Sequence, residues 1–367
     1  MEAAVEKVNS LRLSKDSKYL VAGTSWGYRV YTLRPTKLIL KKEVPNGVKL
    51  AIPCPNEGII TYLEDKSTEE GKEKTGERLV IYDHSNEGEE LYHLKFSKKV
   101  IDVKYINFTL IVVQEHIVKI IKFSDFKNPK VIETAENPYG AVGINRYLET
   151  DKDDVKHLQL IACPGTESDA DVFVTDIEND TRYSFFPGYA TNKYVVTALE
   201  LNSQGSLLAA ATTEGKSIDI FDVQNMAKLY SLSRGRFPKH IDFLSFQQYD
   251  RELIVSAIDG AVHLFSLLTE KEIQDQEEGS TMLTAAFKLA FTTTSGVKFR
   301  VNNEQSEIDS DSDNRYISCK IDSNLLMTIS NSGYLFIGSY KLSDDEAIIE
   351  ETIDYLSKPL SSPKNTS

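Results

Sequence analysis

Three segments of this chain repeat one pattern, and that repetition constrains the fold more than any other feature of the sequence. In each segment an apolar residue precedes a polar turn and a β-type run, and a glycine then leads into a second run that ends in an aromatic residue. The apolar residue and the glycine are 14 residues apart in every copy, as Leu13 and Gly27, Leu201 and Gly215, and Phe246 and Gly260, and the aromatic residues are Tyr31, Phe221 and Phe265. The pattern predicts two adjacent strands joined by a hairpin in which glycine supplies a positive φ.

Weaker copies of the pattern, and other short β-type runs separated by Gly, Asn, Asp and Ser, fill most of the remaining chain. Seven units over about 340 residues give blades of roughly 40–50 residues, which is the usual size of a propeller repeat. The sequence therefore predicts an all-β, seven-bladed β-propeller of the WD40-like type with four-stranded antiparallel blades. We expect one domain over residues 1–345 and a partly disordered C-terminal tail over 346–367.

Composition restricts the partners that such a propeller could have. The formal net charge of −13 repels polyanions, so nucleic acid is not expected to bind and any recognition of phosphate must be local. The N-terminus has no signal-peptide pattern, and no stretch approaches 18 uninterrupted apolar residues. The three cysteines are far apart and suit buried free thiols in a reducing compartment. We expect a monomer in the cytoplasm.

Motifs for catalysis and for metal binding are missing from the sequence. The Gly-Lys-Ser at 215–217 has Ala210 where a phosphate-binding loop requires its first glycine, and it falls within a predicted hairpin rather than before a helix. The six histidines include no i, i+4 pair and no nearby cysteine that would suit zinc. The carboxylates are numerous, but they have no recognisable pairing. We therefore predict a noncatalytic binding platform without a cofactor or a metal ion.

The stretch from Asn192 to Leu267 closely resembles the fifth and sixth blades of the PROPPIN family. This family of soluble propellers docks on membranes that carry phosphoinositides, and it includes the yeast autophagy propellers and the mammalian WIPI proteins. The resemblance continues more weakly through 8–33, 93–123 and 137–144. It implies a seven-bladed propeller with two headgroup pockets at its rim.

The family's defining motif, Phe-Arg-Arg-Gly, lies between these two blades, and each of its arginines serves one pocket. The matching residues here are Leu232, Ser233, Arg234 and Gly235, so a serine replaces one arginine unless Arg236 turns back to take its place. Ser233 offers one neutral hydrogen bond where arginine offers a charged fork. In the sixth blade, two hydroxyl positions of the family fall at about Ala257 and Ala261. The resemblance implies a phosphoinositide-binding set consisting of Asn192, Thr212, Lys216, Ser233, Arg234, Gly235, Arg236, His240 and His263.

PROPPINs also carry a loop in the sixth blade that inserts apolar side chains into the bilayer. The corresponding stretch here, 267–291, begins with an acidic half and continues with apolar residues at helix-like spacing. We take Met282, Leu283 and Phe287 as the membrane-contacting residues. The apolar second half of this stretch could instead be the last strand of the sixth blade, packed in the core.

These observations leave two functions open. The first is a peripheral, noncatalytic effector that recognises phosphatidylinositol 3-phosphate or the 3,5-bisphosphate. Such an effector would recruit autophagy or trafficking proteins, through its blade loops, to preautophagosomal, endosomal or vacuolar membranes. The second is a propeller that has lost lipid binding and serves only as a protein-interaction scaffold, which the serine, the two alanines and the acidic charge favour.

Overall fold

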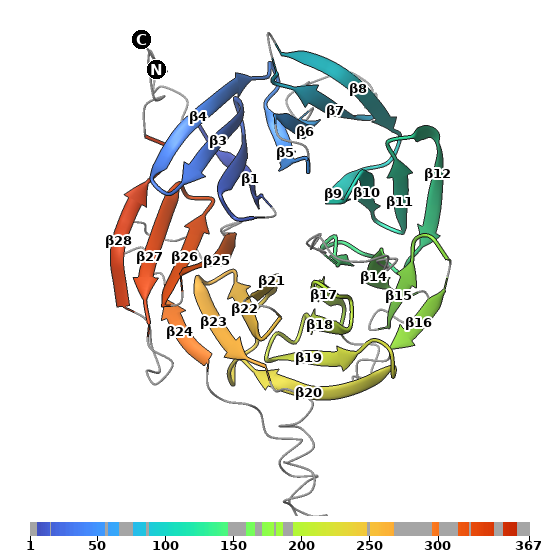
Figure 1. The fold of residues 1–367 in the computed structure, drawn as a ribbon, viewed down its shortest axis with the longest axis vertical. Coiled ribbons are helices and arrows are strands. Elements are labelled where there is room, and N and C mark those ends of the chain that lie inside the picture. Colours follow the sequence, from blue (N-terminus) through green and yellow to red (C-terminus); the bar gives the residue numbers. More distant parts are fainter. Residues whose placement is uncertain are drawn as a thin grey trace, which may run out of the picture.

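The computed structural model is a ring of seven four-stranded antiparallel sheets, which confirms the predicted seven-bladed propeller (Figure 1). It describes residues 6–14, 16–55, 58–65, 76–85, 88–145, 159–165, 171–179, 181–185, 194–247, 250–267, 296–300, 315–322, 324–340 and 348–357. In every blade the strands follow chain order from the centre of the ring to its rim. Within the described ranges, no helix is long and apolar enough to cross a bilayer.

The first four blades occupy the N-terminal half of the chain. Blade 1 contains β1 (Val8–Leu13), β2 (Tyr19–Thr24), β3 (Gly27–Leu33) and β4 (Thr36–Glu43). Blade 2 contains β5 (Val48–Pro53), β6 (Ile59–Glu64), β7 (Glu77–Asp83) and β8 (Glu89–Phe96). Blade 3 contains β9 (Val100–Ile106), β10 (Thr109–Gln114), β11 (Ile117–Lys122) and β12 (Asp125–Glu133). Blade 4 contains β13 (Gly143–Ile144), β14 (Leu160–Pro164), β15 (Val172–Asp176) and β16 (Arg182–Phe185).

The last three blades complete the ring. Blade 5 contains β17 (Val196–Leu201), β18 (Leu207–Thr212), β19 (Ser217–Asp222) and β20 (Ala227–Ser233). Blade 6 contains β21 (Ile241–Gln247), β22 (Glu252–Ala257), β23 (Ala261–Ser266) and β24 (Gly296–Arg300). Blade 7 contains β25 (Tyr316–Asp322), β26 (Leu325–Ser330), β27 (Tyr334–Ser339) and β28 (Ile348–Asp354). The propeller therefore continues through β28, into the segment beyond residue 345 where we expected a tail.

The hydrophobic core is divided among the seven boundaries between neighbouring blades. Each boundary holds one cluster of buried side chains drawn from both blades. This arrangement explains why the middle strands are apolar on both faces: Leu207–Thr212, for example, is buried from its second residue to its last. Packing between blades thus fixes each blade's orientation, and with it the positions of the loops at the blade ends.

Among the described strands, none is shared between the two ends of the chain to close the ring, because all four strands of blade 7 follow blade 6 in sequence. Side chains make the closure instead. Arg29 donates a hydrogen bond from Nη1 to the carbonyl oxygen of Leu356 at 2.8 Å, and the rings of Tyr31 and Tyr355 meet edge to face with centroids 5.2 Å apart. Val8 and Leu11 pack with Cys319 and Met327 in the cluster at this boundary.

The three cysteines are buried free thiols, as the sequence indicated. Among the described residues, no group of three His, Cys, Asp or Glu side chains could hold a metal ion.

Candidate functional site

The segment between blades 5 and 6, residues 234–240, lies against the β18–β19 hairpin of blade 5 and is hydrogen-bonded to it. The amide of Arg234 donates to the carbonyl of Lys216 at 2.8 Å, and the amide of Gly235 reaches the same oxygen at 3.4 Å. At the other end of the segment, the carbonyl of His240 accepts a hydrogen bond from the amide of Ile258 in the β22–β23 hairpin. Two equivalent hairpins therefore border one connecting segment.

Gly215 allows the hairpin of blade 5 to approach this segment closely. Its φ is +58°, and a Cβ added there would lie 1.7 Å from the carbonyl oxygen of Lys239. Only glycine fits this contact without moving the backbone. The predicted role of the repeat glycine is confirmed here, and it extends to the placement of the segment that carries Arg234.

Arg234 is buried and is held by backbone oxygens on both sides. Its Nε donates to the carbonyl of Gly215 at 2.8 Å, and its Nη2 donates to the carbonyl of Phe237 at 2.7 Å. Only 8% of the residue is exposed. Burial lowers the pKa of the guanidinium, and the nearby Asp259 carboxylate opposes that shift. Arg234 is thus a fixed positive charge that also organises its own loop.

Three further cations come from the same segment or from the hairpin against which it lies, and their side chains are open to solvent. Arg236 and Lys239 are exposed residues of the same segment, while Lys216 comes from the hairpin of blade 5. Lys216 lies 3.1 Å from a carboxylate oxygen of Glu214, and Lys239 lies 3.6 Å from one of Asp259. Phe237, which is 78% exposed, projects from the middle of the segment. In a chain of net charge −13, this is a local concentration of positive charge beside an exposed aromatic ring.

The other predicted site residues are placed less uniformly. Ser233 is the last residue of β20 and pairs with Ser217, next to Arg234. Gly235 is exposed, and a Cβ added there would meet no other atom within 4 Å. Thr212 is 4% exposed, and its hydroxyl accepts a hydrogen bond from the amide of Glu214. Its hydroxyl therefore serves the hairpin turn.

The rings of the two histidines of the predicted set pack on aromatic side chains. His263 lies in β23, is 6% exposed and stacks on Phe265 with ring centroids 5.8 Å apart. The ring of His240 packs on Tyr139, from the connection between blades 3 and 4, at 4.7 Å, and burial lowers its pKa. Asn192, Met282, Leu283 and Phe287 lie outside the described residues.

The structure brings together Lys216, Ser233, Arg234, Gly235 and Arg236 at one edge of blades 5 and 6. Sequence reasoning missed Glu214, Lys239 and Asp259, which the structure adds to this cluster. Each of the two carboxylates directly precedes the glycine of its hairpin. Aligning the repeats on their glycines would have revealed that shared position.

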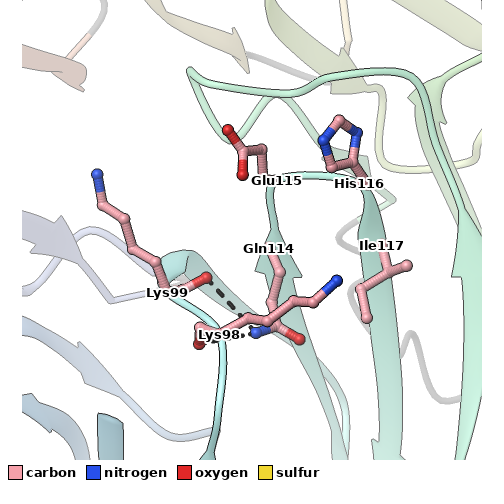
Figure 2. Close-up of a pocket in the computed structure, with 6 residues that line it drawn as sticks. All are labelled: Lys98, Lys99, Gln114, Glu115, His116 and Ile117. Carbon is pink, nitrogen blue, oxygen red and sulfur yellow. Dashed lines mark hydrogen bonds between the residues drawn. The ribbon is translucent and has the colours of Figure 1, made fainter. Parts of the chain in front are cut away.

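A second candidate site lies at the equivalent loops of blade 3 (Figure 2). A cavity of about 310 Å³ is lined by Lys98, Lys99, Gln114, Glu115, His116 and Ile117. The buried Gln114 donates from Nε2 to the carbonyl of Lys98 at 2.9 Å, which ties the β8–β9 connection to β10. Both lysines, Glu115 and His116 are exposed, so two cations and one carboxylate lie together at the cavity.

Comparison with known proteins identifies one matching family model, PROPPIN, over residues 8–333. Autophagy-related protein 18 of Komagataella pastoris is 24% identical over 291 residues, which covers 71% of this chain and 52% of that protein. The protein of the same name from Dictyostelium discoideum is 23% identical, with 71% of this chain and 66% of that protein covered. The chain thus spans between about half and two thirds of the length of these relatives.

Solved structures with the same fold cover nearly the whole chain. Kluyveromyces lactis Hsv2 with a complete loop 6CD superposes with a TM-score of 0.72 at 15% identity, over 96% of this chain and 100% of that one. The complex of KlAtg21 with the coiled-coil of AgAtg16 superposes with a TM-score of 0.70 at 13% identity, over 95% of this chain and 99% of that one.

Proposed function

The chain belongs to the PROPPIN family, and from that premise we propose that it is a noncatalytic propeller that binds phosphoinositide headgroups at the edge of blades 5 and 6. The lipids are phosphatidylinositol 3-phosphate or the 3,5-bisphosphate. The protein acts from the cytoplasm at preautophagosomal, endosomal or vacuolar membranes. The curated relatives are autophagy-related proteins, which supports the same setting.

The observation that carries this proposal is the set of four cations at one edge of an acidic chain. Lys216, Arg236 and Lys239 belong to the segment of the fixed Arg234 guanidinium or to its bordering hairpin, and together the four can bind several oxygens of a phosphorylated inositol ring. Phe237 lies among them with most of its ring exposed. An aromatic side chain flanked by cations suits the boundary between headgroups and acyl chains of an anionic bilayer.

A vesicle flotation experiment tests the proposal. Phosphatidylcholine vesicles with and without phosphatidylinositol 3-phosphate are compared for the wild type and for an Arg236→Ala/Lys239→Ala variant. These two residues are exposed, whereas Arg234 holds its loop, so this variant changes charge and removes only the solvent-exposed pair of Lys239 with Asp259. We expect the variant to bind about tenfold or more weakly, since each lost charged hydrogen bond costs about 1.5–3 kcal/mol.

A Lys37→Ala/Lys127→Ala variant is the matched control, because it removes the same charge from exposed residues of blades 1 and 3. Equal losses in the two variants would show that only net charge matters, and would count against the site. If the wild type floats with none of the phosphoinositides, lipid binding itself is refuted.

A second function, docking of a protein partner, is favoured by the cavity at blade 3. Lys98 and Lys99 line it together with Glu115 and His116, and Figure 2 shows the Lys99 side chain directed away from His116. Such a cavity suits an acidic segment of a partner protein, and a related propeller is known in complex with a coiled coil. We propose that autophagy or trafficking proteins bind there. Recovery of a partner by the wild type and by Arg236→Ala/Lys239→Ala, but not by Lys98→Glu/Lys99→Glu, would separate this function from lipid binding.

A further inference from the structure

The two hairpins that border the Arg234 segment carry a carboxylate at the same position. Glu214 precedes Gly215 and Asp259 precedes Gly260, and both hairpins form the same turn. In blade 5 the amide of Gly215 donates to the carbonyl of Thr212 at 2.9 Å, and in blade 6 the amide of Gly260 donates to that of Ala257 at 3.0 Å. The carboxylates therefore take equivalent places on either side of one segment.

Each carboxylate is paired with a lysine of the cation cluster. Lys216 Nζ lies 3.1 Å from Glu214 Oε1, and Lys239 Nζ lies 3.6 Å from Asp259 Oδ2. The lysine side chains are 43% and 46% exposed, whereas each carboxylate is only 20% exposed. The acids are thus the more enclosed members, and the lysines are the members that solvent, or a ligand, can reach.

The hairpin backbone holds the Asp259 carboxylate, because the amide of Ala261 donates to Asp259 Oδ1 at 3.3 Å. In blade 5 the amide of Glu214 donates to the Thr212 hydroxyl at 3.4 Å, which fixes the main chain of the turn that carries Glu214. The Glu214 oxygen, 3.1 Å from the Lys216 ammonium group, occupies a position that a phosphate oxygen would take in a charged hydrogen bond. The Asp259 oxygen, 3.6 Å from the Lys239 ammonium group, makes a looser ion pair. Carboxylate and phosphate therefore compete for the same two lysines.

We propose that Glu214 and Asp259 are built-in competitors that determine which anionic lipids this edge of the propeller accepts. This inference rests on the proposed function. A phosphate monoester on the inositol ring carries between one and two negative charges and displaces the single charge of a carboxylate. A phosphodiester such as phosphatidylserine or unmodified phosphatidylinositol offers only one charge at its phosphate, so it gains nothing from the exchange. The carboxylates thus make the site selective for monoesters over ordinary anionic lipids.

The two acids are expected to differ in strength. Glu214 pairs with Lys216, whereas Asp259 pairs with Lys239 and also acts electrostatically on the buried Arg234 guanidinium. Removing the Asp259 charge should therefore make the electrostatic potential at the cation cluster more positive than removing the Glu214 charge does.

The test uses the full chain with Glu214→Gln, Asp259→Asn and the double variant, each checked for an unchanged circular dichroism spectrum. A Glu43→Gln/Glu178→Gln variant is the matched control, because it removes two carboxylates that pair with lysines elsewhere, at 3.0 Å and 2.9 Å. Vesicles are phosphatidylcholine alone, with phosphatidylinositol 3-phosphate, or with phosphatidylserine. Calorimetry with soluble inositol 1,3-bisphosphate separates recognition of the headgroup from contact with the bilayer.

We expect each single variant to bind the 3-phosphate vesicles about two- to fivefold more tightly, with Asp259→Asn the stronger, since this is the scale of a partly exposed ion pair. The double variant should also bind phosphatidylserine vesicles that the wild type and the control leave unbound. Unchanged or weaker binding by the double variant to both vesicle types, while the wild type binds the 3-phosphate, overturns the inference and leaves the proposed function intact.

Two further outcomes separate the inference from the proposed function. If the double variant binds the 3-phosphate and the wild type binds nothing, the competition is supported and the proposed function of the natural chain is refuted. If neither binds any vesicle or the soluble bisphosphate, both are overturned.

Discussion

Replacing Gly215 by alanine tests how the cation segment is held between blades 5 and 6. The added Cβ meets two separate penalties. The residue has φ +58°, a left-handed conformation that costs an L-residue about 1–2 kcal/mol. The Cβ would also lie 1.7 Å from the carbonyl oxygen of Lys239, and backbone atoms must move to relieve that overlap. Overpacking of this kind adds about 1–3 kcal/mol.

Gly205→Ala is the matched control, because it carries the first penalty with a milder contact. Gly205 has φ +74° in the same blade, and its added Cβ would meet the end of the Leu160 side chain at 2.6 Å. A leucine side chain can shift its terminal methyl group, whereas a backbone carbonyl cannot move alone. The difference between the two variants therefore measures the contact between Gly215 and Lys239.

Differential scanning calorimetry measures the difference in stability between the two variants as a difference in Tm. An unfolding entropy of about 2.1 cal/mol/K per residue over 367 residues makes each kcal/mol worth roughly 1.3 °C. We expect Gly205→Ala to lower Tm by about 1–3 °C and Gly215→Ala by about 3–6 °C. Gly215→Ala should also weaken vesicle binding, because the Gly215 carbonyl accepts the Arg234 Nε–H and the displaced segment carries Lys239. Equal melting temperatures for the two variants would refute the argument that this contact places the segment.

Three further predictions concern buried groups. Glu252→Ala removes the carboxylate that pairs with Lys320, and because both side chains are only about 10% exposed, the change should lower the free energy of unfolding by about 3–5 kcal/mol. Glu178→Ala is the control, since its pair with Lys122 is about half exposed. A Tm of Glu252→Ala no lower than that of the control would contradict this prediction. Burial raises the pKa of Asp242 to about 7, so the folded protein keeps this proton to a higher pH than the unfolded chain does. The free energy of unfolding therefore falls as the pH rises from about 4 to about 7. Asp242→Asn should remove that loss, and Tm curves that stay parallel from pH 4 to pH 8 would refute it. Burial raises the pKa of the Cys319 thiol to about 12, and all three cysteines are buried. A thiol reagent at pH 8 should therefore label them only as fast as the protein opens. Rapid labelling of the native protein would contradict this prediction.

The sequence predicted the inner part of the propeller better than its rim. The three strong copies of the repeat appear as the β2–β3, β18–β19 and β22–β23 hairpins, with Gly27, Gly215 and Gly260 at positive φ. Their strands are buried, so hydrophobic patterning marks them clearly. The sequence predicts a tail where β28 lies, because β28 is the outermost strand of blade 7 and six of its seven residues are exposed. Such a strand has no buried face, so hydrophobic patterning does not mark it.

The first strand of blade 4 escaped detection for a different reason. β13 consists of Gly143 and Ile144 alone, and two residues carry no periodicity. An added Cβ at Gly143 would approach the amide of Glu200 in blade 5 to 3.1 Å, so close packing between the blades accounts for the glycine. Such a contact depends on two blades together, and no pattern within either segment shows it.

The carboxylates beside Arg234 were missed because each looks like an ordinary polar turn residue when its hairpin is considered alone. The equivalent residue is Trp26 in blade 1 and Ser332 in blade 7, so the turn itself does not require an acid before its glycine. Among these four equivalent hairpins, acids occur only in the two that border the cation segment, and each of them contacts a lysine of that segment or its neighbour. A requirement of the fold would apply to all four hairpins, whereas a requirement of the site applies only to these two. The distribution of Glu214 and Asp259 therefore supports a role in ligand selection over a role in the turn.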